Sequence, residues 1–110
     1  MAANRVLDLN VPPTAIHCMN EYIAYGANIS INERGLRIPE DISLSGHDGL
    51  EITKVMTPKL TTIKAPIFSM GEAAAELMLQ RIHFGKKKDK QLILFDSTVS
   101  IGDSTAGIKE

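Results

Sequence analysis

The stretch from Gly35 to Asp48 constrains the fold of this chain more than any other. Gly35 suits the left-handed conformation that ends a helix, and a proline-containing turn follows it. The apolar residues within 42–46 then predict a short buried strand that ends just before Asp48. Ligands of open α/β sheets bind beyond the carboxyl ends of the strands. The position of Asp48 therefore predicts a ligand-binding carboxylate at the edge of such a sheet.

The composition is that of a folded domain in a reducing compartment. Of the 110 residues, 44% are apolar, which suffices for one modest core. The net charge of −1, from 12 basic and 13 acidic residues, creates no overall field toward nucleic acid or an anionic membrane. Cys18 is the single cysteine, which excludes an intrachain disulfide. Because no export signal or membrane-spanning run occurs, we expect a cytoplasmic location and no membrane contact.

Helical and extended patterns alternate along the first half of the chain. Residues 2–9 predict the tail of a helix, and the apolar run 15–19 predicts a short strand. Asn20 suits the N-cap of an amphipathic helix that continues to Gly35. Together with the strand at 42–46, this order predicts a βαβ unit with parallel strands. The expected fold class is α/β.

The second half of the chain continues the alternation. The β-branched residues within 60–64 predict another strand, and Pro66 suits the first turn of a second long helix. The apolar residues of this helix fall on one face as far as Ile82, so that face needs a partner surface. The segments 91–95 and 98–101 are strand-like.

Several short motifs occur in an order and at a spacing typical of one protein family. They are Pro13-Thr14-Ala15-Ile16, Ala24-Tyr25-Gly26-Ala27, Glu33 to Ser43, Gly46-His47-Asp48, Leu60-Thr61-Thr62-Ile63, Met70 to Ala74 and Asp103-Ser104-Thr105. Over about residues 12–106 the chain resembles the lactose-repressor/galactose-repressor (LacI/GalR) family of transcriptional regulators. The resemblance implies an incomplete three-layer, parallel-sheet lobe of a type I periplasmic-binding-protein-like domain.

The resemblance also implies a division of the chain between two lobes. Residues 1–65 correspond to the C-terminal lobe of an effector-binding domain, while residues 66–101 correspond to a crossover helix and strands of the N-terminal lobe and the return. The helix-turn-helix, the hinge helix and most of the first lobe of the family have no counterpart here. Helix-turn-helix readout needs a recognition helix in the major groove, so we expect no direct DNA binding by this chain alone.

Three ligand-binding positions follow from the resemblance. Asp48 corresponds to the first aspartate of a Gly-Phe/Tyr-Asp-Asp segment, which accepts hydrogen bonds from sugar hydroxyls or a base edge. Asn20 corresponds to an asparagine that can face the ligand, although Glu21 departs from the aspartate that follows it in the family. His47 replaces the usual aromatic residue, and Gly49 replaces the second aspartate. The implied effector is a sugar or a purine-like molecule; the alternatives are a turn aspartate at 48 and a simple N-cap at 20.

The resemblance further implies a homodimer. Tyr25, Ile29, Val55 and Met56 correspond to positions that line the contact between C-terminal lobes, and aromatic residues and methionine are enriched in such contacts. Exchange of the helix 66–83 between subunits is one way to cover its apolar face. The alternative is that these are ordinary core or surface residues.

The sequence predicts no catalytic residues, no metal ligands and no cofactor. His17, Cys18, His47 and His83 have no known spacing for a metal or a nucleophile, and neighbours such as His17 and Cys18 point to opposite faces of a strand. The lysine-rich connection 86–90 is typical of a solvated loop. We therefore expect a non-enzymatic effector-binding and dimerisation fragment of a LacI/GalR-like transcriptional regulator, lacking its DNA-binding domain. The alternative is a truncated, stand-alone homodimerisation module without ligand binding.

Overall fold

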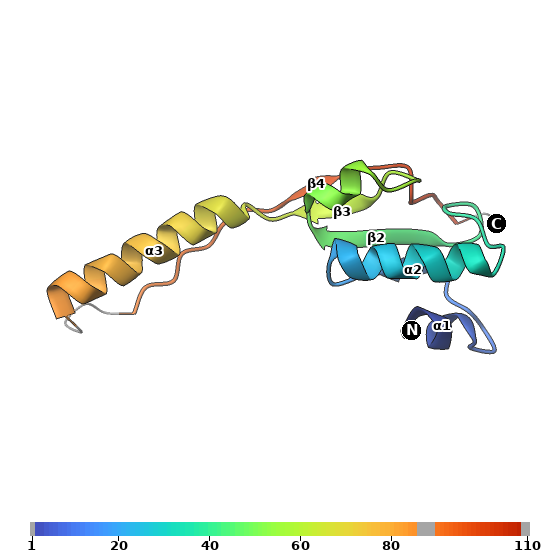
Figure 1. Cartoon of the computed structure of the whole chain (residues 1–110), viewed down its shortest axis with the longest axis horizontal. Helices are drawn as coiled ribbons and strands as arrows, with labels where there is room; N and C mark the ends of the chain where they lie inside the picture. The colour runs from blue at the N-terminus through green and yellow to red at the C-terminus, as the bar shows by residue number, and fades with distance from the viewer. Residues whose placement is uncertain (1, 86–89, 109–110) are drawn as a thin grey trace. The chain divides into compact units, whose positions relative to one another are not determined.

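A computed structural model describes residues 2–85 and 90–108 and divides the chain into two compact units (Figure 1). The larger unit comprises Met1–Lys64 with Thr98–Glu110, and the smaller unit comprises Ala65–Ser97. Most of the lysine-rich connection, residues 86–89, lies outside the described residues. The helices are α1 (Ala2–Leu7), α2 (Glu21–Glu33), the 3-10 helix η1 (Glu51–Lys54) and α3 (Ile67–Phe84), and the strands are β1 (Ala15–His17), β2 (Ser43–Asp48), β3 (Thr61–Lys64) and β4 (Thr98–Ser100).

The larger unit is built on a four-stranded sheet of order β1-β2-β3-β4. Strands β1, β2 and β3 are parallel, and β4 pairs antiparallel with β3. Helix α2 connects β1 to β2, as expected for a crossover between adjacent parallel strands. The α/β class and the parallel centre of the sheet are confirmed.

Alternation along β2 decides which face of the sheet is covered. Leu44 and Gly46 are buried, whereas Ser45 and His47 between and after them are only partly buried. Leu44 belongs to one core cluster with residues of both α1 and α2, so these helices cover the same face. The described residues thus supply the sheet and one helical layer of the expected lobe.

Helix α2 begins and ends as its sequence predicts. The side chain of Asn20 accepts a hydrogen bond from the backbone N–H of Ile23 at 3.0 Å, an interaction that stabilises a helix by about 1 kcal/mol. Ala24, Ala27 and Ile31 of this helix are buried in the core. Gly35 follows the helix with a φ of +71°, which is the left-handed stop.

Three strand predictions need correction. The strand predicted over 15–19 is shorter in the structure, because only Ala15–His17 pairs with β2. Strand β2 continues past Gly46 to Asp48, because β3 offers partners in the register His47↔Ile63 and Asp48↔Lys64. The predicted strand at 91–95 is wrong, since the described residues of this segment form no strand. Strand formation requires a paired neighbour, which β3 provides for Thr98–Ser100.

The described residues of the smaller unit are α3, residues 65 and 66 before it, Gly85, and the irregular segment 90–97. None of the residues of α3 is buried, and the apolar side chains Met78, Ile82 and Phe84 are exposed. The assignment of this helix to a second lobe stays a prediction. Within the described ranges, none of the helices has the length and apolar character needed to cross a bilayer.

Candidate ligand-binding site

Asp48 and His47 lie at the carboxyl end of β2, the end at which parallel sheets bind ligands. The two side chains are partly exposed, and Nδ1 of His47 lies 3.1 Å from Oδ1 of Asp48. The tautomer with a proton on Nδ1 donates this hydrogen bond to the carboxylate. The second carboxylate oxygen is thus available to an incoming donor group.

His17 lies beside this pair on the neighbouring strand. The rings of His17 and His47 meet edge to face, with centroids 6.3 Å apart and an interplanar angle of 79°. Nδ1 of His17 is also 3.0 Å from the hydroxyl oxygen of Ser45. The sequence predicts no shared role for these two histidines. The parallel register of β1 and β2 brings them together on one face of the sheet.

Asn20 and Cys18 serve the structure around this edge. The side-chain oxygen of Asn20 is used in the cap of α2, so the N-cap alternative is realised in the structure. Cys18 is buried, and burial raises the pKa of its thiol, which disfavours the thiolate needed of a nucleophile. Opposite orientations of His17 and Cys18 are confirmed by the exposure of the first and the burial of the second.

The backbone that carries Asp48 has an unusual conformation. Asp48 has a φ of +89°, which non-glycine residues adopt rarely and at a conformational cost. Gly49 follows with a φ of +73°, and a Cβ added there would lie 2.6 Å from Cγ of Lys64. Only glycine therefore fits at position 49, and two consecutive left-handed residues turn the chain sharply at the end of the strand.

Glu21 is the residue of this region that the sequence pattern did not reveal. Its carboxylate is fully buried, and Oε1 accepts hydrogen bonds from the backbone N–H of Gly49 at 2.8 Å and from the hydroxyl of Thr62. An acidic residue after an N-cap predicts an exposed partner of the helix dipole. Gly46 is the sequence feature that could have indicated the burial of Glu21, because a glycine within a strand often marks the close approach of another group. A Cβ at position 46 would lie 3.5 Å from Cγ of Glu21 and 2.9 Å from Leu60.

The four residues expected at a dimer contact fall into two groups. Tyr25 and Val55 are exposed, and Ile29 is partly buried. Met56 is 6% exposed and belongs to the core cluster, together with residues of α2 and β2, so its side chain is not available to a dimer contact. The structure thus leaves Tyr25, Ile29 and Val55 accessible on the larger unit.

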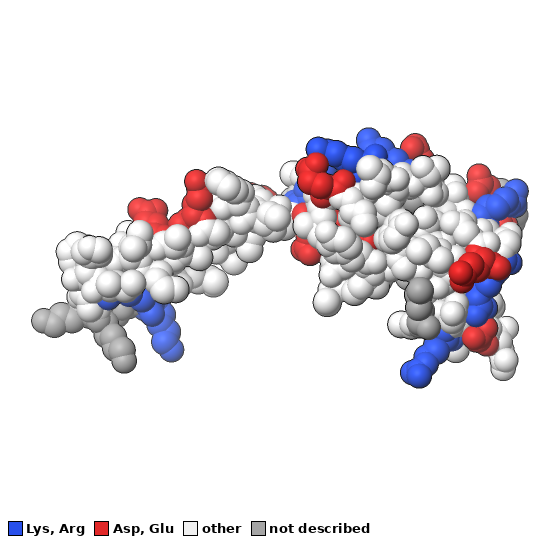
Figure 2. Space-filling view, viewed as in Figure 1, with Lys and Arg blue, Asp and Glu red and all other residues white. Residues whose placement is uncertain are grey.

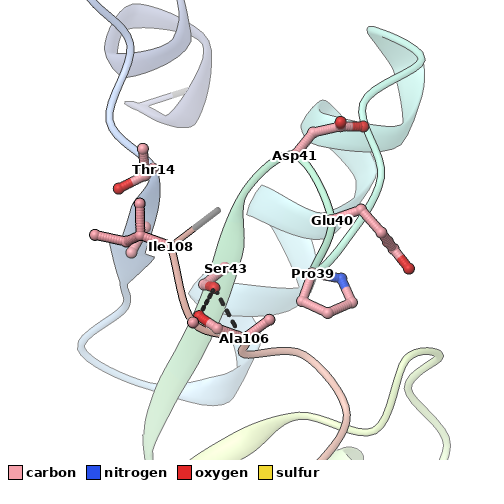
Figure 3. A pocket seen from close by; sticks show the side chains of 9 residues that line it. Thr14, Pro39, Glu40, Asp41, Ser43, Ala106 and Ile108 are labelled. Carbon is pink, nitrogen blue, oxygen red and sulfur yellow. Dashed lines mark hydrogen bonds between the residues drawn. The ribbon is translucent and has the colours of Figure 1, made fainter. Parts of the chain in front are cut away.

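Asp48 lines neither of two pockets that described residues of the larger unit form. One, of about 450 Å³, lies between α1, β1 and α2 and is mostly apolar. The other, of about 270 Å³, lies at the amino ends of β1 and β2, where Ser43 bonds to Ala106 (Figure 3). Across residues 2–85 and 90–108, no three His, Cys, Asp or Glu side chains are arranged to hold a metal ion.

Charge is distributed without a dominant sign on the visible surface. On the face shown in Figure 2, acidic and basic side chains are interspersed over the larger unit. Within the described residues, acidic and basic side chains form the ion pairs Arg34–Asp8, Arg37–Asp41 and Lys54–Glu51. This face offers no continuous basic patch for a phosphate backbone.

Comparison with known proteins identifies the fold. Residues 1–105 match the model of the periplasmic binding protein-like domain. The chain belongs to this family. It corresponds to part of the effector-binding domain of LacI-family transcriptional regulators, which are not enzymes.

Three relatives illustrate the match of this periplasmic binding protein-like chain. The HTH-type transcriptional repressor PurR of Vibrio atlanticus is 38% identical over 96 residues, which are 87% of this chain and 28% of that protein. The ribose operon repressor of Haemophilus influenzae is 37% identical over 88% of this chain and 29% of its own length. A LacI family regulator of Enterococcus faecalis with bound ribose superposes with a TM-score of 0.87 at 34% identity, covering 98% of this chain and 39% of that structure. The chain thus spans less than a third of the curated relatives.

Proposed function

We propose that this chain forms one wall of the effector site of a LacI-type transcriptional regulator, with Asp48, His47 and Asn20 toward the ligand. The observation that supports the proposal is the placement of Asp48. Its partly exposed carboxylate stands at the carboxyl end of β2 on a left-handed backbone, a conformation whose cost is commonly found at functional sites. In the complete regulator, effector binding between two lobes shifts the equilibrium that sets operator affinity.

The chemistry of the wall favours a hydroxyl-rich small molecule such as a pentose. Asp48 offers a carboxylate oxygen as an acceptor, and His47 and His17 offer imidazole nitrogens beside it. Hydrogen bonds to a carboxylate are among the stronger kinds. A relative of 34% identity holds ribose, and another relative is a ribose operon repressor. Because such repressors act on DNA, we propose a cytoplasmic location for the complete regulator.

Titration of the 110-residue chain with ribose tests the proposal. Amide resonances of His47, Asp48 and Gly49 are expected to shift with a millimolar dissociation constant, because one wall supplies only part of the contacts. Asp48→Asn should weaken binding by about tenfold, since it removes a hydrogen bond to a charged acceptor. Asp103→Asn, at an exposed aspartate away from β2's carboxyl end, is the matched control. Unchanged spectra, or equal losses in the two variants, would contradict the proposal.

A second candidate function is self-association through α2 and the segment after η1. Tyr22, Tyr25 and Ile29 form a stripe on α2 at helical spacing, and the two tyrosines are exposed. Asn28 donates a hydrogen bond from Nδ2 to the carbonyl of Thr57 at 3.4 Å, which holds the segment after η1 against this helix. Val55, 81% exposed, lies in the same region. Exposed aromatic and aliphatic side chains of this kind favour a homodimer contact.

Sedimentation of the chain at tens of micromolar tests this second function. The wild-type chain is expected to be dimeric, and Val55→Asp should shift it to monomer because a buried, unpaired charge opposes association. Val11→Asp is the matched control, since Val11 is 85% exposed and lies in the connection between α1 and β1. A wild-type chain that stays monomeric at all concentrations would contradict the dimer proposal. Dimerisation without any response to ribose would favour the stand-alone interaction module; exchange of helix 66–83 stays a further prediction.

A further inference from the structure

Glu21 joins three elements at the edge where Asp48 lies. Its side chain is 0% exposed and reaches from the start of α2 to the turn after β2 and to Thr62 of β3. The cap of α2 is already supplied by Asn20, so the carboxylate of Glu21 is not needed for that purpose. Its contact with the turn after β2 is the 2.8 Å hydrogen bond accepted from the Gly49 N–H.

This contact acts on the most strained part of the site. Asp48 and Gly49 both have positive φ, and the Gly49 N–H belongs to the peptide bond that joins these two residues. An L-aspartate with a φ of +89° persists only when surrounding contacts hold it there. The hydrogen bond from the Gly49 N–H to the buried carboxylate of Glu21 is such a contact.

Burial of this carboxylate has a cost that packing alone would not require. Its second oxygen, Oε2, is buried and has no hydrogen-bond partner among the described residues. An apolar side chain of similar volume fills buried space without this desolvation cost. A glutamate here is therefore better explained by the geometry that its Oε1 imposes than by core stability.

We propose that Glu21 is a positioning residue that holds Asp48 in its left-handed conformation by anchoring Gly49 N–H. The expected effect of Glu21 on ligand binding rests on the proposed function of Asp48. Its expected effect on the backbone at Asp48 and Gly49 does not depend on that function. Without the anchor, the Asp48 backbone relaxes toward negative φ and its carboxylate leaves the wall.

Nuclear magnetic resonance of the full 110-residue chain tests the backbone part without any ligand. In the wild type, Asp48 should show the strong amide-to-Hα cross-peak of a positive φ, and the Gly49 amide should resonate at low field and exchange slowly. Glu21→Gln retains an acceptor oxygen and should preserve these signals. Glu21→Leu has no acceptor oxygen and should abolish the signals of both Asp48 and Gly49. Glu21→Met, whose side chain is unbranched like that of glutamate, should abolish them as well. A Gly49 amide that exchanges as fast as an exposed loop amide in the wild type overturns the proposal without any variant.

Thr62→Val provides the matched control for general loss of stability. This change removes the other hydrogen bond to Glu21 but leaves the Gly49 contact in place. The signals of Asp48 and Gly49 should therefore persist in Thr62→Val, and urea unfolding of Thr62→Val and Glu21→Leu compares their losses of stability. Loss of these signals in Thr62→Val, or their survival in Glu21→Leu, would show that stability rather than anchoring decides the turn.

Ribose affinity then links the backbone to the ligand. Glu21→Gln should bind within about twofold of the wild type, and Glu21→Leu should lose about tenfold, the loss expected of Asp48→Asn. If the wild type binds no ribose, the proposed function fails while the resonance signals still decide the role of Glu21. If the wild type binds and Glu21→Leu binds equally well, the positioning role is overturned.

Discussion

The hydroxyl of Ser104 donates a hydrogen bond to the backbone carbonyl of Leu44 at 2.6 Å, across 60 residues of sequence. The same hydroxyl oxygen accepts a hydrogen bond from the backbone N–H of Thr61 at 2.8 Å. One buried side chain thus bridges Leu44, which lies one residue before the stretch of β2 that pairs with β3, and Thr61 at the start of β3. This contact ties the C-terminal segment to the centre of the sheet.

Ser104→Ala should lower the free energy of unfolding by about 1–3 kcal/mol, because it leaves a buried carbonyl and a partly buried N–H without this partner. Urea unfolding followed by circular dichroism measures the loss. Ser97→Ala, at an exposed serine outside the larger unit, should change little. An equal effect of the two substitutions would show that the bridge is energetically unimportant.

Gly102→Ala should also destabilise the larger unit. A Cβ at this position would lie 2.3 Å from the carbonyl oxygen of Lys59 and 2.8 Å from the carbonyl carbon of Leu60, which are backbone atoms that cannot turn away. Overpacking of this kind costs about 1–3 kcal/mol or more. Gly107→Ala meets nothing within 4 Å and is the matched control. Equal midpoints of thermal unfolding for the two variants would contradict the structure at this contact.

Variants of Asn20 separate helix capping from ligand contact. Asn20→Ala should lower stability by about 1 kcal/mol because the N–H of Ile23 loses its acceptor, while Asn20→Ser should retain most of it. Both variants remove the side-chain amide. A loss of ribose binding in Asn20→Ser at unchanged stability would assign a ligand contact to the amide. If the loss of ribose binding parallels the loss of stability in both variants, the role of Asn20 is helix capping alone.

Acid should remove a stabilisation that depends on Asp8. The hydrogen bond from Arg34 lowers the pKa of the Asp8 carboxyl, so the folded chain binds this proton less tightly than the unfolded chain. The contribution is complete above the ordinary aspartate pKa and is lost as the pH falls through the lowered value. Because both side chains reach solvent, the effect should be small and should shrink in high salt.

Titration of the Asp8 carboxyl carbon by nuclear magnetic resonance measures this shift. Its midpoint should lie below the ordinary aspartate value of about 3.9, and Arg34→Gln should return it to that value. Asp8→Asn should flatten the acid side of the stability curve as the pH falls below the ordinary aspartate pKa of about 3.9. A midpoint that does not respond to Arg34→Gln would assign the shift to another cause.

Local signals predicted the helices and most of the strands well. Asn20 and Gly35 mark the two ends of α2 through the chemistry of capping and of positive φ, which acts within a few residues. Strand edges were predicted less well. Residues 47 and 48 joined β2 and residues 91–95 formed no strand, because pairing depends on what lies alongside.

The α/β class, the capped helix and a carboxylate at the end of β2 were predictable from the amino-acid sequence. Hydrophobic periodicity, turn residues and the order of motifs depend on residues close together in the sequence, so they can be recognised without the structure. Only the tertiary structure decided that Glu21 is buried against Gly49 and Thr62, and that His17 meets His47. These contacts depend on the register of parallel strands joined by a helix, and register is set by packing across the whole sheet.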